Sequence, residues 1–402
     1  MKLFLKSSFI ITCSAILAHA CTTAIVSGKA SADGRPLLLK HRDSDFPENK
    51  VMFFADGRYE YIGLVNAGDA EGMEVWAGCN SAGFAIMNSA SYNLNVKDTT
   101  RAKDREGVLM KAALQSCASV DDFENFLARA KKPLGVEANF GVIDAQGNGA
   151  YFETGQFAFR KFDVNDPAVA PFGYLIRTNF SYVGDRDHDL GVIRYNTATE
   201  LFLNASLSNT LSLSFLLQDI SRSVQNAFTK VDWSINLPED ETSRIIDVQD
   251  FIPRSSTSAS IVVQGIKAGE NPSFTTMWTV LGLPFCSIAL PSWVAGGKNL
   301  PAALAADDSG KAPQSTRAYA LRKKCFPVKG RSSQNYIDLA LLMNRKGTGI
   351  WQRLRPVEDE IIRETNRRLT LWRSTGMNTG SISAFYQWLE RRVDEAYVGI
   401  AY

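Results

Sequence analysis

The stretch CTTAIVSGKASADGRPLLLKHRDSD, residues 21–45, decides how the rest of this 402-residue sequence is interpreted. CTTAIVSG and RPLLLKHRD are short runs rich in β-forming residues, and the Asp33-Gly34 pair between them is typical of a turn. The stretch therefore predicts two consecutive strands, the first of which begins at Cys21. The residues before it indicate that Cys21 also begins the mature chain.

The 20 residues before this stretch have the pattern of a secretory signal peptide. Lys2 and Lys6 form a positive n-region, residues 7–17 are an apolar stretch, and Ala-His-Ala at 18–20 presents small residues to signal peptidase. The apolar stretch is too short to span a bilayer as an anchor. We therefore expect residues 1–20 to be removed and the protein to be exported to the periplasm or the extracellular space.

Cleavage before Cys21 would place a thiol and a free α-amine on the same residue. An α-amine normally titrates near pH 7.7–8.0 and a cysteine thiol near 8.5, so the amine can take the thiol proton directly or through one water. One residue then supplies both nucleophile and base, and no histidine is needed. The sequence contains only three histidines, at positions 19, 41 and 188. Cys21 therefore predicts cleavage of an acyl bond through a thioester.

Two other interpretations of Cys21 remain. It is a structural cysteine near the start of a strand, or a lipoprotein cysteine whose acylated amine anchors the chain. The lipoprotein pattern expects a bulky aliphatic residue three positions before the cysteine, where this sequence has Ala18. In either case the chain is a non-catalytic envelope protein, anchored or disulfide-bonded through Cys21.

The composition excludes several classes of function. Hydrophobic residues make up 45% and charged residues 21%, which is typical of a globular domain and not of a disordered chain or a coiled coil. The net charge of +2 gives no sign of a nucleic-acid surface. No segment after the leader has about 18 uninterrupted apolar residues, so we expect no stable membrane insertion of the mature chain. No metal cluster, phosphate loop or dinucleotide fingerprint is present, so no cofactor and no metal are expected.

The mature chain keeps five cysteines. An odd number in an exported protein leaves at least one unpaired, and at most two disulfides are possible. The sequence does not assign pairs among Cys79, Cys117, Cys286 and Cys325, nor does it give the oligomeric state.

Blocks of strands alternate with blocks of helices along the chain. Strand-like runs fill residues 21–95, helical repeats follow in REGVLMKAALQSC and VDDFENFLARA, and strands resume with ANFGVIDA. A helical region near 190–220, the strands SASIVVQG, FTTMWTVLG and CSIALPSWV, a loop-like stretch at 296–316 and amphipathic C-terminal helices complete the pattern. Because regular βαβ units are absent, the sequence predicts an α+β fold of two antiparallel sheets between helical layers.

The stretch 21–45 is similar to the mature N-terminus of N-terminal-nucleophile (Ntn) hydrolases that begin with cysteine. This group includes choloylglycine hydrolases, penicillin V acylases, acid ceramidase-like amidases and the acyl-CoA:6-aminopenicillanic acid acyltransferase-like proteins, whose bacterial linear-amide hydrolases look closest. The resemblance extends from Cys21 to about Val294. It implies a four-layer αββα Ntn-hydrolase sandwich over residues 21–330, with a helical C-terminal extension at 331–402 packed on it.

The resemblance also implies a reaction. It points to a hydrolase of carbon–nitrogen bonds other than peptide bonds, acting on a small-molecule N-acyl amide. A cysteine dipeptidase of the same superfamily shares the CTT, AS and DG elements and the run Gly78–Gly83, so it remains an alternative. An acyltransferase, in which an amine rather than water resolves the thioester, is the other.

Six positions match the residues of the family's site. Cys21 corresponds to the nucleophile, and Arg42 and Asp45 in HRDSD match an Arg and an Asp three residues apart, with Asp43 as a rival for the second. The Arg cation favours a thiolate, and the carboxylate orients the amine. The remaining matches are Asn88 in AIMNSASYN, Asn179 in IRTNFS and Arg194 in GVIRYN.

The two asparagines correspond to the donors that bind the oxyanion of a tetrahedral intermediate. Arg194 corresponds to an arginine that holds the asparagines or charges of the site, although Arg186 lies close by in the sequence. Gly78-Cys79 is a rival self-cleavage dipeptide, but no RxxD strand ending follows it.

Aromatic residues offer weaker signals. Phe46, Tyr92 and Trp278 are candidates to line an acyl pocket, although aromatic side chains more often belong to a core.

Overall fold

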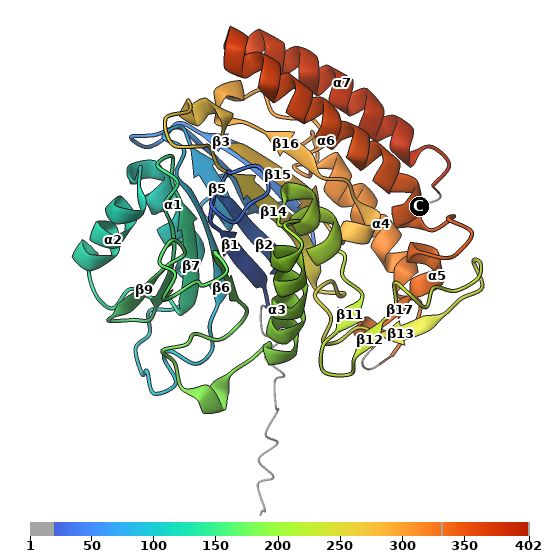
Figure 1. Cartoon of the computed structure of the whole chain (residues 1–402), viewed down its shortest axis with the longest axis horizontal. Helices are drawn as coiled ribbons and strands as arrows, with labels where there is room; N and C mark the ends of the chain where they lie inside the picture. Colours follow the sequence, from blue (N-terminus) through green and yellow to red (C-terminus); the bar gives the residue numbers. More distant parts are fainter. Residues whose placement is uncertain (1–19, 331–332, 401–402) are drawn as a thin grey trace, which may run out of the picture.

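The computed structural model describes residues 20–330 and 333–400, so residues 1–19 of the predicted signal peptide lie outside the described residues. Two antiparallel sheets face each other, and helices cover the outer face of each sheet (Figure 1). The predicted α+β sandwich of two antiparallel sheets between helical layers, with helices at the C-terminal end, is therefore confirmed.

The first sheet contains the N-terminal strand pair. Its order is β10-β1-β2-β14-β15-β16, and all pairs are antiparallel. The strands are β1 (Thr22–Val26), β2 (Leu37–Asp43), β10 (Tyr174–Arg177), β14 (Thr257–Gln264), β15 (Thr276–Leu281) and β16 (Leu290–Ser292). Every residue of β2 is buried because it is a central strand with both faces covered. This explains the nearly continuous apolar run before its charged end.

The second sheet follows the order of the chain from β3 to β9, again with antiparallel pairs. The strands are β3 (Asn49–Phe54), β4 (Tyr61–Asn66), β5 (Ala77–Asn80), β6 (Ala85–Ala90), β7 (Ala138–Ile143), β8 (Gly149–Thr154) and β9 (Phe159–Asp163). β1 and β2 pack against β6 and β7, so the N-terminal strand pair faces the second sheet.

The helices form the outer layers. The elements are α1 (Glu106–Ser116), α2 (Val120–Arg129), α3 (Val192–Leu207), α4 (Pro313–Cys325), α5 (Leu339–Leu342), α6 (Ile350–Thr375) and α7 (Thr379–Tyr397). α1 packs on β5 and β6, whereas α3, α4 and α6 pack on strands of the first sheet. Ser119 caps α2 by accepting the backbone N–H of Asp122 at 3.0 Å. No helix in the described part of the chain is long and apolar enough to cross a membrane.

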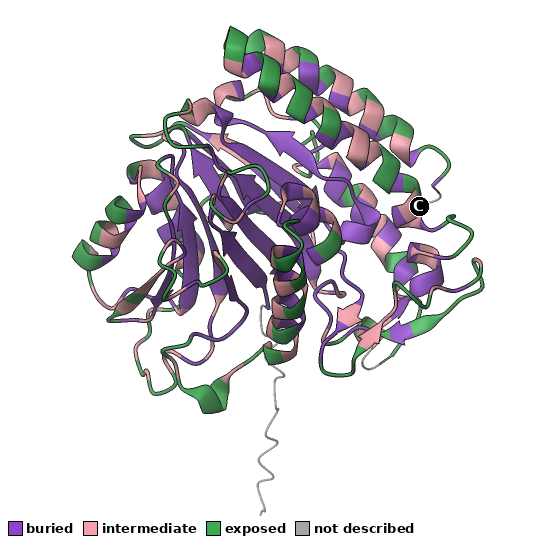
Figure 2. Cartoon of the chain, in the orientation of Figure 1, coloured by how far each residue is buried: buried purple, intermediate pink, exposed green. Residues whose placement is uncertain are grey.

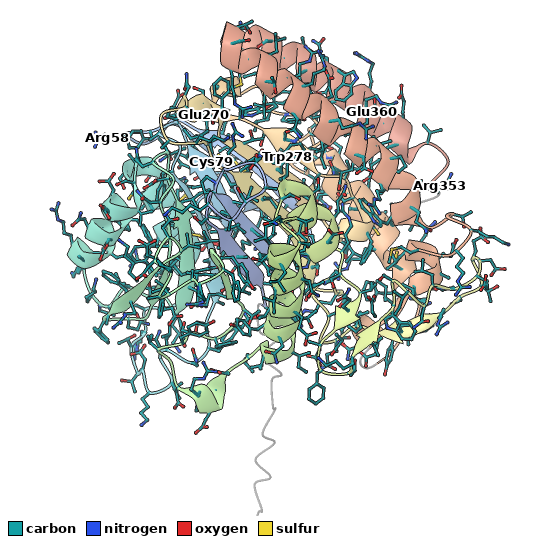
Figure 3. The ribbon with its side chains drawn as sticks, viewed as in Figure 1. Arg58, Cys79, Glu270, Trp278, Arg353 and Glu360 are labelled. Carbon is teal, nitrogen blue, oxygen red and sulfur yellow. The ribbon has the colours of Figure 1, made fainter. Side chains whose placement is uncertain are left out.

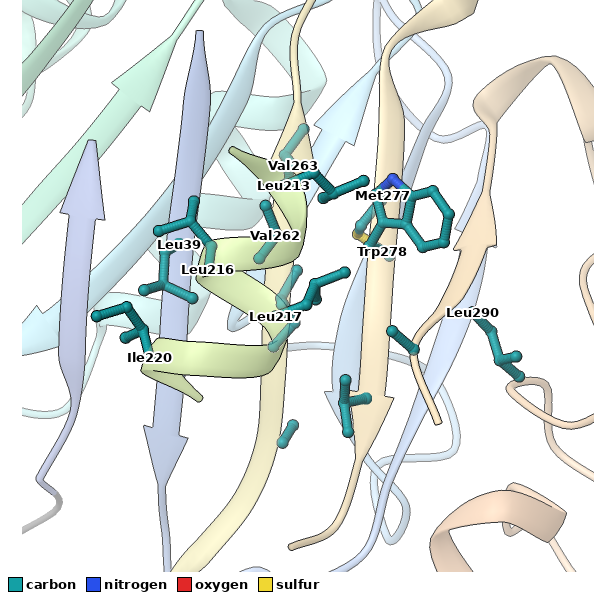
Figure 4. Close-up of a cluster of buried hydrophobic side chains, with 14 of the residues drawn as sticks. Leu39, Leu213, Leu216, Leu217, Ile220, Val262, Val263, Met277, Trp278 and Leu290 are labelled. Carbon is teal, nitrogen blue, oxygen red and sulfur yellow. The ribbon is translucent and has the colours of Figure 1, made fainter. Parts of the chain in front are cut away.

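A hydrophobic turn fills the outer face of the first sheet. The π-helical turn η2 (Phe215–Ile220) packs on β14, and Figure 4 shows its side chains over the sheet. The labelled side chains are Leu39, Leu213, Leu216, Leu217, Ile220, Val262, Val263, Met277, Trp278 and Leu290. Trp278, a candidate for an acyl pocket, lies in this fully buried core.

Two local predictions from the second half of the chain differ from the structure. In CSIALPSWV only Leu290–Ser292 pairs as a strand, because the segment begins as a turn at Pro284–Cys286. Pro291 has no N–H to donate, and it lies in β16 at the edge of the sheet. The predicted loop at 296–316 ends early because α4 begins at Pro313, a residue well suited to a first helical turn.

The C-terminal helices share the core of the first sheet. Trp293 stacks on Tyr386 and meets Trp372 edge to face, with ring centroids 5.8 and 5.3 Å apart. Figure 2 shows buried faces of α6 and α7 toward the sheet and exposed faces away from it. A boundary at residue 330 remains a prediction. Two small ribbons complete the fold: β11 (Gln225–Asn226) with β12 (Val231–Asp232), and β13 (Ile245–Asp247) with β17 (Tyr336–Asp338).

All five cysteines of the described chain are free and buried. The Sγ atoms of Cys286 and Cys325 lie 3.7 Å apart. Cys79 lies inside the fold in Figure 3, in contrast to Arg58 and Arg353 at its periphery.

Candidate active site

Cys21 immediately precedes β1 and is buried. β1 pairs with β2 in a register that joins Thr22 to His41 and Thr23 to Lys40, and continuing this register places Cys21 opposite Arg42. Because side chains alternate along a strand, Cys21, Lys40 and Arg42 share one face of the sheet. That face is turned toward the second sheet.

Arg194 ties Cys21 and Thr22 to helix α3. Its Nη1 donates to the carbonyl oxygen of Cys21 at 2.7 Å and to Thr22 Oγ1 at 3.0 Å. Its Nη2 donates to Asn179 Oδ1 at 2.6 Å. The guanidinium passes so close to Gly191 (φ 76°) that a Cβ there would collide with it, which explains a glycine at the start of the helix. Arg194 thus contacts Cys21 directly and connects Asn179, a second predicted site residue, to it.

Asn179 also contacts the end of β6. Its Nδ2 donates to the carbonyl oxygen of Ala90 at 3.0 Å, and its own carbonyl accepts the backbone N–H of Tyr92 at 3.2 Å. The segment after β6 therefore lies against the end of the first sheet. This contact brings Asn179 to the region where Asn88 ends its strand.

Asn88 is hydrogen-bonded to Lys40, which lies on the same face of the first sheet as Cys21. Lys40 Nζ donates to Asn88 Oδ1 at 2.5 Å and to the carbonyl oxygen of Trp76 at 2.8 Å. Burial lowers the pKa of Lys40 to about 7; Arg42 acts in the same direction, while a Cys21 thiolate and Glu106 oppose it. The sequence interpretation missed this lysine, although a charged residue two positions before Arg42 in a strand was the available signal.

Arg42 is a buried cation with neutral hydrogen-bond partners. Its Nη1 donates to Asn49 Oδ1 at 2.7 Å and its Nη2 to Asn66 Oδ1 at 2.9 Å. Burial lowers its pKa to about 10, against the opposing charges of a Cys21 thiolate, Glu74 and Asp43. Because neither of these partners carries a negative charge, the Arg42 cation is available to stabilise a nearby anion.

The two aspartates of HRDSD lie in different environments. Asp45, favoured by spacing, is exposed beyond the end of β2. Asp43 is buried and accepts Arg254 Nε and Thr257 Oγ1, both at 2.8 Å. It points to the same side of β2 as His41, away from the face that carries Lys40 and Arg42. The structure therefore does not bring Asp45 to the other predicted site residues.

A cavity of about 440 Å³ lies beside this cluster. Asn88 and Trp76 belong both to the cavity wall and to the hydrogen bonds of Lys40. Phe46 and Tyr92, two of the predicted pocket aromatics, also line it. The cavity is thus open to a ligand next to the residues that surround Cys21.

Acidic side chains dominate the charge of the cavity. Its charged lining consists of Glu74, Asp98, Lys103, Asp104, Glu106 and Glu137. Burial raises the pKa of Glu106 to about 7, with hydrogen bonds from backbone N–H groups opposing and Asp104 and Glu137 reinforcing the rise. This lining favours ligands without negative charge.

Other chemical groups lie outside the cluster. Burial raises the pKa of Cys79 to about 12, so the rival cysteine does not supply a thiolate near neutral pH. Burial lowers the pKa of His41 to about 4, and its Nε2 lies 3.2 Å from Thr257 Oγ1. In residues 20–330 and 333–400, no group of three or more His, Cys, Asp or Glu side chains is placed to hold a metal ion.

Asn179→Ala should lower kcat by about a hundredfold, because the predicted oxyanion donor and the partner of Arg194 Nη2 are both lost. Steady-state kinetics on an N-acyl amide measures the change. Asn80→Ala is the matched control, since it removes an equally buried amide whose partners are all backbone groups: it donates to carbonyls of α1 and its C-cap and accepts the N–H groups of Ala82 and Phe84. Equal kcat values for the two variants would contradict the role of Asn179.

Comparison with known proteins finds similar solved structures but no match in sequence. No protein-family model matches the chain, and no curated protein matches it in sequence. Among solved structures, a variant of conjugated bile acid hydrolase from Clostridium perfringens is 11% identical, with a TM-score of 0.35 over 65% of this chain and 89% of that one. The Caenorhabditis elegans ortholog of N-acylethanolamine-hydrolyzing acid amidase is 13% identical, with a TM-score of 0.37 over 63% and 93%.

Penicillin V acylase from Agrobacterium tumefaciens is 10% identical, with a TM-score of 0.33 over 67% of this chain and 85% of that one. Similarity at this level does not identify a substrate. The role of each site residue is therefore argued from the contacts and burial of that residue.

Proposed function

We propose that this chain is an exported amidohydrolase of the N-terminal-nucleophile cysteine class, acting on the carbon–nitrogen bond of a small N-acyl amide. The observation that carries the proposal is the setting of Cys21. It is buried at the start of an interior strand, near the cations Arg42 and Arg194. Positive charge around a thiol favours the thiolate, which is the nucleophilic form.

The proposed reaction uses Cys21 twice. Its α-amine, freed by removal of the leader, takes the thiol proton while Sγ attacks the amide carbonyl. Asn88 and Asn179 donate to the oxyanion of the tetrahedral intermediate. The ammonium then protonates the leaving nitrogen, the carbon–nitrogen bond breaks, and a thioester remains. Water attacks the thioester, giving its proton to the amine, and the acid is released as the thiol re-forms.

Asp43 and Asp45 are the two candidates for the carboxylate that orients the Cys21 amine. Asp43 is buried close to the strand pair, whereas Asp45 is exposed. We assign Arg42 to thiolate stabilisation, and Arg194 to holding Asn179 and the Cys21 carbonyl. Residues 21–330 would form the catalytic domain and 331–402 the extension packed on it.

The charge of the cavity gives a prediction about substrates. We expect uncharged or cationic N-acyl amides to have a kcat/KM at least about tenfold above that of anionic analogues with the same acyl group, since the cavity carries five acidic side chains and one lysine. Paired substrates that differ only in a terminal carboxylate or ammonium measure this ratio. The difference should shrink at high ionic strength. A preference for the anionic member would contradict it.

A second candidate is a cysteine dipeptidase: the acidic lining would attract the α-ammonium group of a dipeptide, which also carries an α-carboxylate. A dipeptide panel assayed beside the N-acyl amides separates the two reactions. Acyl transfer is distinguished by adding an acceptor amine and looking for the new amide.

The experiment that tests the proposed function is mass spectrometry of the exported protein, with and without 4-nitrophenyl acetate as an acylating probe. A chain that begins at unmodified Cys21 and gains one acetyl group on that thiol is the expected result. A lipid-modified Cys21 or a different first residue would remove the base from the mechanism. The chain would then be the anchored, non-catalytic envelope protein.

A further inference from the structure

Two asparagines beside Cys21 are held in the same way. The amide oxygen of Asn179 accepts Arg194 Nη2 at 2.6 Å, and the amide oxygen of Asn88 accepts Lys40 Nζ at 2.5 Å. An asparagine amide has one oxygen and one NH₂ group, so a cation bound to the oxygen decides which way the amide faces. The first pair follows from the family pattern, and the second does not.

Burial and a second hydrogen bond fix the contact between Lys40 and Asn88. Lys40 is 1% exposed and has a second acceptor in the carbonyl of Trp76, so its ammonium is fixed between two partners. Asn88 lines the cavity, and the described residues supply no acceptor for its Nδ2. With the oxygen bound to Lys40, the NH₂ group is the part of the amide left for a ligand.

We propose that Lys40 is a positioning residue of this site: it fixes the Asn88 amide with its NH₂ group toward the cavity. The inference rests on the proposed function. A donor on an amide oxygen also polarises the amide, so Asn88 becomes a stronger donor to an oxyanion.

The test uses the processed, full-length protein and two measurements. The rate of acetylation of Cys21 by 4-nitrophenyl acetate reports the oxyanion donor. The rate of Cys21 alkylation by iodoacetamide, a reaction that forms no oxyanion, reports the thiol itself. Lys40→Met keeps the length and apolar stem of the side chain without its donor. We expect acetylation to slow by about 10- to 100-fold, while alkylation keeps its wild-type rate.

Lys50→Met is the matched control. Lys50 is a buried lysine in β3 that donates to the backbone carbonyls of Ala67 and Gly310, at 3.1 and 3.5 Å. Its loss tests the general effect of removing a buried ammonium, and we expect wild-type values in both measurements. Lys40→Gln keeps an N–H donor, so it should recover part of the acetylation rate. It also provides the comparison if Lys40→Met does not fold.

A third variant tests whether Lys40 acts through Asn88. On the alkaline plateau, where Cys21 is fully ionised, Lys40→Met combined with Asn88→Ala should be no slower than Asn88→Ala alone. Wild-type acetylation in Lys40→Met, or a further loss when Lys40→Met is added to Asn88→Ala, would overturn the inference while leaving the proposed function in place. If the wild-type protein does not acetylate at Cys21, both the proposed function and the role of Lys40 are wrong.

Discussion

Replacing Cys21 with serine is expected to lower kcat/KM by about 10⁴-fold or more, the scale on which removal of an enzyme nucleophile acts. A serine hydroxyl is a far weaker nucleophile than a thiol at the pKa of an α-amine. The measurement is steady-state turnover of the best N-acyl amide, together with N-terminal sequencing to verify that the leader is still removed.

Cys117→Ser is the control for this experiment. Cys117 is another buried free thiol, but it lies at the end of α1 on the outer side of the second sheet. Its replacement should leave turnover near the wild-type value. If Cys21→Ser retained wild-type turnover, the thioester mechanism would be refuted and the non-catalytic interpretation would gain support.

Glu358→Gln should lower the free energy of unfolding by about 3–5 kcal/mol, because it leaves a buried cation without its counter-charge. Glu358 accepts Arg222 Nη2 at 2.7 Å, and both side chains are at most 1% exposed. The same carboxylate accepts the backbone N–H of Ala289 at 2.7 Å, and the Arg222 guanidinium stacks on the ring of Trp351. Denaturant titration of both proteins measures the difference.

Glu360→Gln is the matched control, two residues along the same helix. Glu360 pairs with Arg392 at 2.6 Å, but both side chains are partly exposed, and Figure 3 shows Glu360 at the surface. Solvent screens this pair, so its loss should change stability by less than about 1 kcal/mol. If Glu358→Gln were equally mild, burial of the ion pair with Arg222 would not be what makes Glu358 important for stability, and the prediction would be wrong.

Much of the fold could be predicted from local patterns. The runs CTTAIVSG and RPLLLKHRD pair as β1 and β2, and the helical repeats after residue 105 become α1 and α2. The prediction was less accurate after residue 284, where prolines at 284 and 291 shorten the expected strand. In that region the edge of the sheet and the packing of α6, not a local period, determine the structure.

The candidate site could be predicted only in part. The positions of Arg42, Asn88, Asn179 and Arg194 came from the resemblance, and the structure brings all four to the neighbourhood of Cys21. The structure does not do so for Asp45, because β2 ends at Asp43 and the next residues turn to the surface. Spacing along a chain does not show where a strand leaves the sheet.

The sequence by itself determined that strands and helices occur in blocks, that the sheets are antiparallel, and that Cys21 is the candidate nucleophile. These properties follow from the order and spacing of neighbouring residues. Only the tertiary structure decided that Lys40 meets Asn88, that Arg194 reaches Cys21 across 173 positions, and that acidic side chains line the cavity. Such contacts depend on how distant segments pack and on which side chains the packing buries. The spacing of neighbouring residues in the sequence contains neither kind of information.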